Sequence, residues 1–96
     1  MNFNFHPSAV KEFAASIDYY ESIYSGLGLE FSEEVYSTIQ RILLYPKAWV
    51  KISNKCRRCI THRFPYGIIY QIKNDEILIV SVMQLNQKPK KWEDRI

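Results

Sequence analysis

The residues best suited to chemistry lie between Cys56 and Tyr70, in the segment CRRCITHRFPYGIIY. This segment contains three arginines, and an arginine side chain can hold a phosphate or a carboxylate through two parallel hydrogen bonds. If the segment begins with a strand, its arginines lie close together and can follow a phosphate backbone. They can instead pair with the acids of a protein partner. Both interpretations stay open for Arg57, Arg58 and Arg63.

His62 is the candidate for proton transfer. It lies between Thr61 and Arg63, and a histidine within hydrogen-bonding distance of a reacting group can act as a general base. We therefore take His62 and Arg63 as candidate catalytic residues, with an ordinary surface histidine on a strand as the alternative. On a strand from 57 to 64, alternate residues lie on opposite faces. Each face carries both apolar and charged groups, so the pattern does not determine which one is buried.

The two cysteines of the chain, Cys56 and Cys59, form one CxxC pair. A redox CxxC opens a helix after a strand, and a zinc site needs two further ligands. The sequence offers neither, and residues three apart on a strand point to opposite faces, so we expect two free thiols. Neither histidine has a partner at metal-ligand spacing, and phosphate-loop, HExxH and GxSxG motifs are absent from the sequence. We therefore expect no metal and no cofactor.

A second basic segment, NQKPKKWEDRI, closes the sequence. Basic residues interleaved with an aromatic residue can bind nucleic acid. The interpretation that we favour is that Trp92 packs on the body of the protein while the charges stay in water. The two basic segments together give the predicted residues for binding a target or a nucleic acid: Arg57, Arg58, Arg63, Lys88, Lys90, Lys91 and Arg95.

The charge of the chain is unevenly distributed. Residues 1–46 contain two basic and six acidic residues, a net charge of −4, whereas residues 47–96 contain eleven basic and four acidic residues, a net charge of +7. This asymmetry indicates an anionic partner for the second half, unless the charges form an ordinary solvated surface. No segment approaches the roughly 18 apolar residues of a membrane span, and MNFNFHPSAV does not read as a signal peptide. We therefore expect a cytoplasmic protein without a membrane partner.

The elements that must position these residues form one domain over residues 1–96. Asn2 to Phe5 alternates as a short strand does. Apolar residues at helical spacing predict a helix from about Ser8 to Tyr24, and a second one that ends near Tyr45, before Pro46. The glycines of the SGLG segment between them allow the chain to reverse, so that the helices form an antiparallel hairpin.

Beyond a loop at 47–55, the period changes to that of strands, predicted at 57–64, 67–73 and 76–83. Asn74-Asp75 is a plausible tight turn, and short connections imply an antiparallel meander. The fold class is therefore α+β, with a short N-terminal strand, a helical hairpin and a three-stranded antiparallel meander. The last two strands are apolar on both faces, so we expect the tail and a partner to cover the face opposite the helices.

In order and spacing, several segments resemble the RelE/ParE superfamily of toxins from type II toxin–antitoxin modules, and its ParE-like branch in particular. They are FHPSAVKEF, IDYYE, GLGLEF, YPKAW, RRCITHRFPYGIIY and KPKKWEDR, and they span nearly the whole chain. The resemblance implies a small cytoplasmic toxin of a plasmid-stabilisation module. It also implies a cognate antitoxin that lays an extended and helical segment across the sheet and groove, in an assembly that is either a homodimer or a heterotetramer with the antitoxin.

The resemblance implies two kinds of target. ParE-like toxins inhibit DNA gyrase, whereas RelE-like toxins cut mRNA on the ribosome with basic sheet residues and a late arginine and tyrosine. Arg57, Arg58 and Arg63 match the basic strand of the RelE-like toxins. Met83-Gln84 and Asn86, however, stand where the late arginine and tyrosine are expected. We therefore expect a gyrase inhibitor that stops growth without being an enzyme. The alternatives are a ribosome-dependent endoribonuclease and a degenerate, non-toxic member that still binds the antitoxin.

Overall fold

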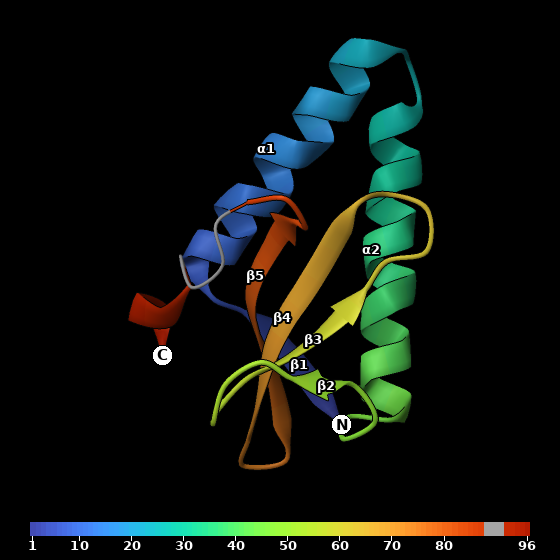
Figure 1. Cartoon of the computed structure of the whole chain (residues 1–96). Coiled ribbons are helices and arrows are strands. Elements are labelled where there is room, and N and C mark those ends of the chain that lie inside the picture. Colours follow the sequence, from blue (N-terminus) through green and yellow to red (C-terminus); the bar gives the residue numbers. More distant parts are fainter. Residues whose placement is uncertain (88–91) are drawn as a thin grey trace.

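The computed structural model describes residues 1–87 and 92–96 of the chain (Figure 1). In chain order, the elements are β1 (Asn2–Phe5), α1 (Pro7–Ile23), α2 (Leu27–Leu44), β2 (Val50–Lys51), β3 (Arg57–Ile60), β4 (Tyr66–Lys73), β5 (Glu76–Gln84) and a short 3-10 helix, η1 (Glu93–Arg95). This order confirms the predicted α+β fold, and the two helices end within one residue of their predicted bounds.

The side chain of His6 sets the start of α1. Its Nδ1 atom accepts a hydrogen bond from the backbone N–H of Ser8 at 3.0 Å, and Pro7 occupies the first helical turn, where its missing N–H costs nothing. His6 therefore has a structural role as the N-terminal cap of α1. From this start, α1 buries Ala9, Phe13 and Tyr20 against the rest of the protein.

The turn between the helices depends on two glycines and one acid. Gly26 has a φ of 92°, a backbone conformation that side chains disfavour. The carboxylate of Glu21 accepts hydrogen bonds from the N–H groups of Gly26 and Gly28 at distances between 3.0 and 3.1 Å. A Cβ on Gly28 would lie 2.8 Å from the carbonyl oxygen of Ile17, so the two helices approach closely at this point. Glu21 thus satisfies free N–H groups at the start of α2.

Within the part of the chain that the structure describes, the sheet contains five strands in the order β1-β5-β4-β3-β2. β3, β4 and β5 form the predicted antiparallel meander, and Asn74 and Asp75 join its last two strands with φ values of 52° and 62°. Both values lie in the left-handed region that a type I′ hairpin turn needs, which confirms the predicted turn. Two pairings were not predicted: β1 lies parallel to β5, and the two-residue β2 pairs with β3.

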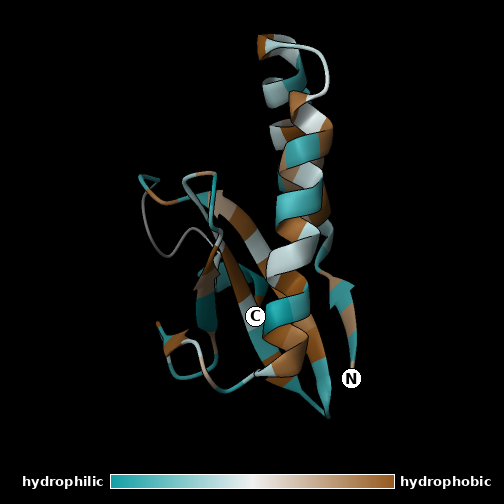
Figure 2. Cartoon of the chain, turned by 90° about the vertical axis from the view of Figure 1, so that its right-hand side faces the viewer, coloured by the Kyte–Doolittle hydropathy of each residue, from teal (hydrophilic) through white to brown (hydrophobic). Residues whose placement is uncertain are grey.

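The helical hairpin covers one face of the sheet, and the turn of the hairpin extends past the sheet (Figure 2). The main core lies between these two layers and includes Phe31, Ile39, Ile68 and Tyr70. On the opposite face a smaller cluster contains Cys56, Ile69, Val80, Met83 and Trp92. Trp92 is 2% exposed, which confirms that its side chain packs on the sheet. The expectation that the charges of this segment stay in water is wrong for Arg95, whose side chain is 12% exposed because it pairs with Glu12.

The predicted strand 57–64 was too long, because β3 ends at Ile60. The N–H of Thr61 donates to the carbonyl of Tyr66 at 3.0 Å, and its hydroxyl donates to the carbonyls of Phe64 and Tyr66. These bonds turn the chain back on itself, as side-chain hydroxyls do in turns. His62 and Arg63 therefore lie in a loop and not on the strand.

Candidate functional site: the arginines of β3 and the C-terminal segment

Arg57 points toward the helical side of the sheet, where it anchors a loop. It pairs with Tyr70 of β4, and its Nη1 atom donates to the carbonyls of Lys47 and Trp49 at 3.1 and 2.8 Å. The hydroxyl of Tyr70 donates to the carbonyl of Pro46 in the same loop at 2.6 Å. Burial raises the pKa of Tyr70 to about 12, although the charge of Arg57 acts in the opposite direction. Arg57 thus stabilises the connection from α2 to β2.

Arg58 points toward the opposite face, beside Ile69 of β4. A Cβ on Gly67 would lie 3.0 Å from the Cδ atom of Arg58, so the arginine stem crosses the strand where a side chain is missing. The side chain lines a cavity of about 230 Å³ together with residues that include Met83 and Trp92. Its Nε atom is buried and has no hydrogen-bond partner among the described residues.

His62 and Arg63 are exposed in the loop between β3 and β4, which α2 holds through two acids. The backbone N–H of His62 donates to Oε2 of Glu34 at 3.1 Å. Nη2 of Arg63 lies 2.9 Å from Oε1 of Glu30, in an ion pair whose two side chains are 58% and 39% exposed. The guanidinium of Arg63 also lies 5.2 Å from the ring centroid of Phe64. Such an exposed ion pair contributes little to stability and is easily exchanged for another one. A binding partner can therefore reach the guanidinium of Arg63.

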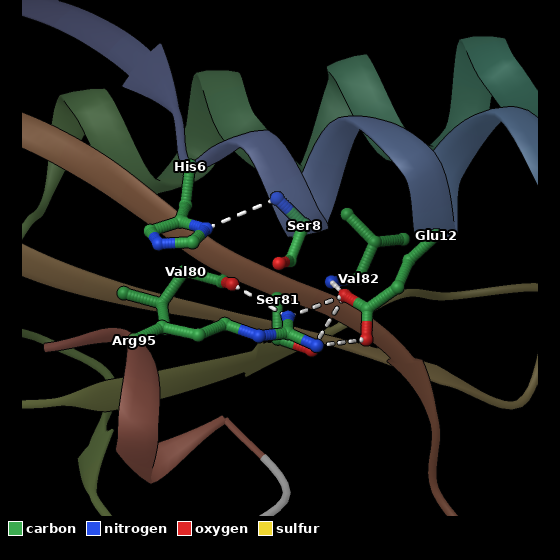
Figure 3. A network of polar contacts seen from close by, with 7 residues as sticks. All are labelled: His6, Ser8, Glu12, Val80, Ser81, Val82 and Arg95. Atoms are coloured by element: carbon green, nitrogen blue, oxygen red, sulfur yellow. Dashed lines mark hydrogen bonds and ion pairs between the residues drawn. The ribbon is translucent and has the colours of Figure 1, made fainter.

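Arg95 forms the most enclosed ion pair described in the structure, with Glu12 of α1 (Figure 3). Nη1 and Nη2 each lie 2.8 Å from one carboxylate oxygen, in a two-bond arrangement. The Arg95 side chain is 12% exposed. The hydrogen bonds that Arg95 donates to the Glu12 carboxylate raise the pKa of Arg95, against the lowering effect of burial. This geometry gives Arg95 a structural role beside its predicted role in target binding.

The Glu12–Arg95 pair also completes the edge of β5. β1 pairs with β5 as far as Ile79, so no strand within residues 1–87 and 92–96 lies beside the rest of β5 on that side. The carboxylate of Glu12 accepts from the N–H of Val82 at 3.1 Å and from the hydroxyl of Ser81 at 2.9 Å. Arg95 donates to the carbonyl of Val80 at 2.9 Å. Two side chains thus take over the hydrogen bonds of a missing strand (Figure 3).

The remaining predicted cations, Lys88, Lys90 and Lys91, lie outside the described residues. The structure instead draws attention to three exposed lysines before β3 that the sequence reasoning had not singled out: Lys47, Lys51 and Lys55. Two of them line a shallow depression together with Arg57. The sequence signal was their spacing of one lysine in every four residues.

The thiols of Cys56 and Cys59 are free and buried in different clusters on opposite faces of the sheet, as predicted. Burial raises the pKa of both thiols, although Arg41 acts against this at Cys59. No group of acidic, histidine and cysteine side chains within residues 1–87 and 92–96 could hold a metal ion. None of the described helices is both long enough and apolar enough to span a bilayer.

Comparison with known proteins decides the family. The family model for the ParE toxin of the type II toxin–antitoxin system parDE matches residues 3–89. The chain belongs to the ParE toxin family. Among solved structures, the "Chromosomal ParDE TA system from P. aeruginosa" is similar, with a TM-score of 0.78, 14% sequence identity, and coverage of 90% of this chain and 97% of that chain. That likeness shows the fold. No curated protein matches the chain.

The predicted resemblance to the ParE-like branch is thus confirmed, and the chain is a toxin-family protein of a type II toxin–antitoxin system. Within this ParE-family chain, three of the predicted site residues, Arg57, Arg58 and Arg63, do not converge. Arg57 lies on the helical side of the sheet, Arg58 on the opposite side, and Arg63 in a loop against α2. The catalytic role of His62 and Arg63 stays a prediction. His62 donates a hydrogen bond through its backbone N–H, and its imidazole has no hydrogen-bond partner among the described residues.

Proposed function

We propose that this ParE-family protein is a cytoplasmic toxin that stops growth by binding and inhibiting DNA gyrase, and that a cognate antitoxin neutralises it. The observation that carries the proposal is that the three arginines do not meet: Arg57 and Arg58 point to opposite faces of the sheet, and Arg63 pairs with Glu30 near the other end of α2 from the loop that Arg57 contacts. A nuclease needs a proton-transferring group and a cationic clamp around one reacting phosphate. Residues that lie on different faces favour a binding function over a catalytic one.

The target-binding surface that we propose is cationic and is formed by the lysines of the β2 region, with the predicted Arg63 as a separate exposed cation in the loop after β3. Lys47, Lys51 and Lys55 are exposed, and none of them forms an ion pair with a described residue. Accessible positive charge attracts an acidic partner and accelerates its binding. The predicted set that also includes Arg57, Arg58, Lys88, Lys90, Lys91 and Arg95 belongs to the same proposal, with Arg57 and Arg95 acting mainly through the structures that they hold.

The antitoxin-binding surface that we propose is the helical hairpin. Apolar residues that α1, α2 and their junction leave exposed include Val10, Tyr19, Ile23, Tyr24, Leu29 and Tyr36. The helices and their flanking residues up to 46 carry a net charge of −4. Exposed apolar groups among acidic ones suit an amphipathic segment with basic flanks. The opposite face is less suitable, because the C-terminal segment already covers part of it.

Controlled expression in bacterial cells tests the proposal. Filamentation with a DNA damage response, and inhibition of supercoiling by purified gyrase, are the expected results. Early loss of translation with cleaved mRNA would instead establish the endoribonuclease alternative. A normal growth rate, together with binding to the antitoxin encoded beside the gene, would identify a non-toxic member. Each of the last two results overturns gyrase inhibition.

A charge-reversal pair tests the proposed surface. The double variant Lys51→Glu/Lys55→Glu should lose gyrase inhibition, because it places acids on the surface that faces the acidic target. The matched control is Lys11→Glu/Lys73→Glu, which makes the same charge change at two exposed lysines elsewhere. The control should inhibit gyrase as the unmodified protein does. Equal loss in both double variants would show that net charge, and not this surface, determines binding.

A further inference from the structure

The face opposite the helices contains a small cavity, and Arg58 is the one described lining residue that also belongs to the predicted target-binding set. Its volume is about 230 Å³, and Ile69, Met83 and Trp92, which are at most 7% exposed, form its inner wall. Ile52 and the exposed Leu85 add further apolar surface, and Gln84, Gln87 and Arg58 supply polar groups. Because an apolar cavity of about 150 Å³ already holds benzene, this cavity can hold one aromatic or branched group.

Arg58 gives this apolar cavity one strong hydrogen-bonding group. Its Nε atom is buried and has no partner among the described residues. Because protein atoms enclose this Nε atom, a ligand in the cavity reaches the guanidinium through its two Nη atoms. The position of the guanidinium depends on Gly67, since a Cβ there would lie 3.0 and 3.1 Å from the Cδ and Cγ atoms of Arg58. The cavity and its cation are therefore built together, from β3, β4 and the segment after β5.

We infer that this cavity binds a small carboxylate that carries one apolar group, either as a free acid or as the last residue of a peptide. The apolar group lies between Met83, Ile69 and Trp92, and the carboxylate accepts hydrogen bonds from the two Nη atoms of Arg58. These two N–H groups point the same way and match the two oxygens of a planar carboxylate. The amides of Gln84 and Gln87 border the same cavity and can bond the remaining lone pairs or a peptide N–H.

The composition of the cavity favours this ligand over a nucleic acid. Arg58 is the one cationic side chain among the described residues that line it, whereas a nucleic acid is held by several cations that follow its phosphates. Base stacking also needs an open aromatic face, and Trp92 is 2% exposed. The cavity is smaller than the roughly 300 Å³ at which ordinary cofactor pockets begin. It therefore suits a single apolar acid.

Nuclear magnetic resonance of the full chain tests this inference, with the indole N–H of Trp92 and the methyl group of Met83 as reporters. Three probes are used. N-acetyl-phenylalanine mimics the C-terminal residue of a peptide, the amide of the same compound is its uncharged counterpart, and phenylacetate mimics a free acid. We expect both acids to shift these reporters with a Kd of about 1 mM, as for other fragment-sized ligands. The amide should bind at least about tenfold more weakly, because it lacks the charge that Arg58 recognises. The tighter of the two acids identifies the source of the ligand.

Three variants complete the test. Arg58→Met keeps the apolar stem and should remove the difference between acid and amide, and Arg58→Lys should restore part of it, because it keeps the charge without the planar pair of N–H groups. Arg63→Met is the matched control, since it removes an exposed arginine outside the cavity, and it should bind as the unmodified protein does. Equal affinity for acid and amide, reporters that do not move, or tighter binding of adenosine 5′-monophosphate at the same reporters would each overturn the inference.

Discussion

The Glu12–Arg95 pair allows a sharp test of how the C-terminal segment is held, because its two side chains have unequal roles. Replacing Glu12 with alanine removes the acceptor for Arg95, for the Ser81 hydroxyl and for the Val82 N–H. Replacing Arg95 with alanine leaves Glu12 bonded to β5, and one donor to the Val80 carbonyl is lost. We therefore expect Glu12→Ala to destabilise the protein more than Arg95→Ala does.

The contacts set the size of this difference. In Glu12→Ala, a guanidinium that is 12% exposed loses its counterion, and two further donors at the edge of β5 lose their acceptor. Breaking a buried pair costs about 3–5 kcal/mol, and a buried donor without a partner costs about 1–3 kcal/mol. Because the Glu12 side chain is itself 18% exposed, water replaces part of what is lost. We expect about 3 kcal/mol for Glu12→Ala and about 1.5 kcal/mol for Arg95→Ala.

Urea unfolding of both single variants and of the double variant measures these values and the coupling between the two residues. The coupling free energy should be about 1.5 kcal/mol, close to the whole effect of Arg95→Ala. The control is Glu33→Ala, which removes an exposed acid of α2 and should change the unfolding free energy by less than about 0.5 kcal/mol. Equal effects of the two single variants, or a coupling near zero, would refute the asymmetry.

Three further predictions concern the core and the hairpin. Gly28→Ala should lower the unfolding free energy by about 1–3 kcal/mol, because the new Cβ would meet the Ile17 carbonyl 2.8 Å away; urea unfolding measures it. Burial raises the pKa of Tyr70 from 10.0 to about 12, so between these values the unfolded state releases a proton that the folded state keeps. Stability should therefore fall as the pH rises through this window, by up to about 2–3 kcal/mol, and the fall should shrink in Tyr70→Phe; unfolding curves across this range test it. Cys56 and Cys59 are 0% and 1% exposed, and burial raises the pKa of both. Ellman's reagent should label them at least about 100-fold more slowly in the folded than in the unfolded protein, and rapid labelling would contradict their burial.

Local patterns predicted the helices and the antiparallel meander. Each helix is marked by apolar residues that recur within a few positions, and by a proline or glycine at its ends, so its bounds depend on near neighbours in the chain. The Asn74-Asp75 turn is equally local, since both residues tolerate the left-handed backbone that it needs. The same holds for the cysteines: alternation along a strand was enough to place their thiols on opposite faces.

Local patterns were not enough where hydrogen bonds join distant segments. The parallel pairing of β1 with β5 brings Phe3 beside Ile77, and no short-range periodicity encodes such a pairing. The pattern of residues 57–64 suggested a long strand, but Thr61 ends it through bonds to the carbonyls of Phe64 in the following loop and of Tyr66 at the start of β4. Arg63 consequently lies in a loop, whereas Arg57 and Arg58 lie on β3.

For the candidate site, the sequence determined which residues carry charge, and the tertiary structure decided what each charge contacts. Composition identified a basic second half, and the family resemblance identified the kind of protein. The destinations of the arginines depend on alternation across a sheet and on contacts with distant acids, as for Arg95 and Glu12. A charged side chain is long and binds any complementary group that folding brings near it. The sequence therefore determines the charge and the hydrogen-bonding groups of such a side chain. Which group it contacts is decided only when the chain has folded.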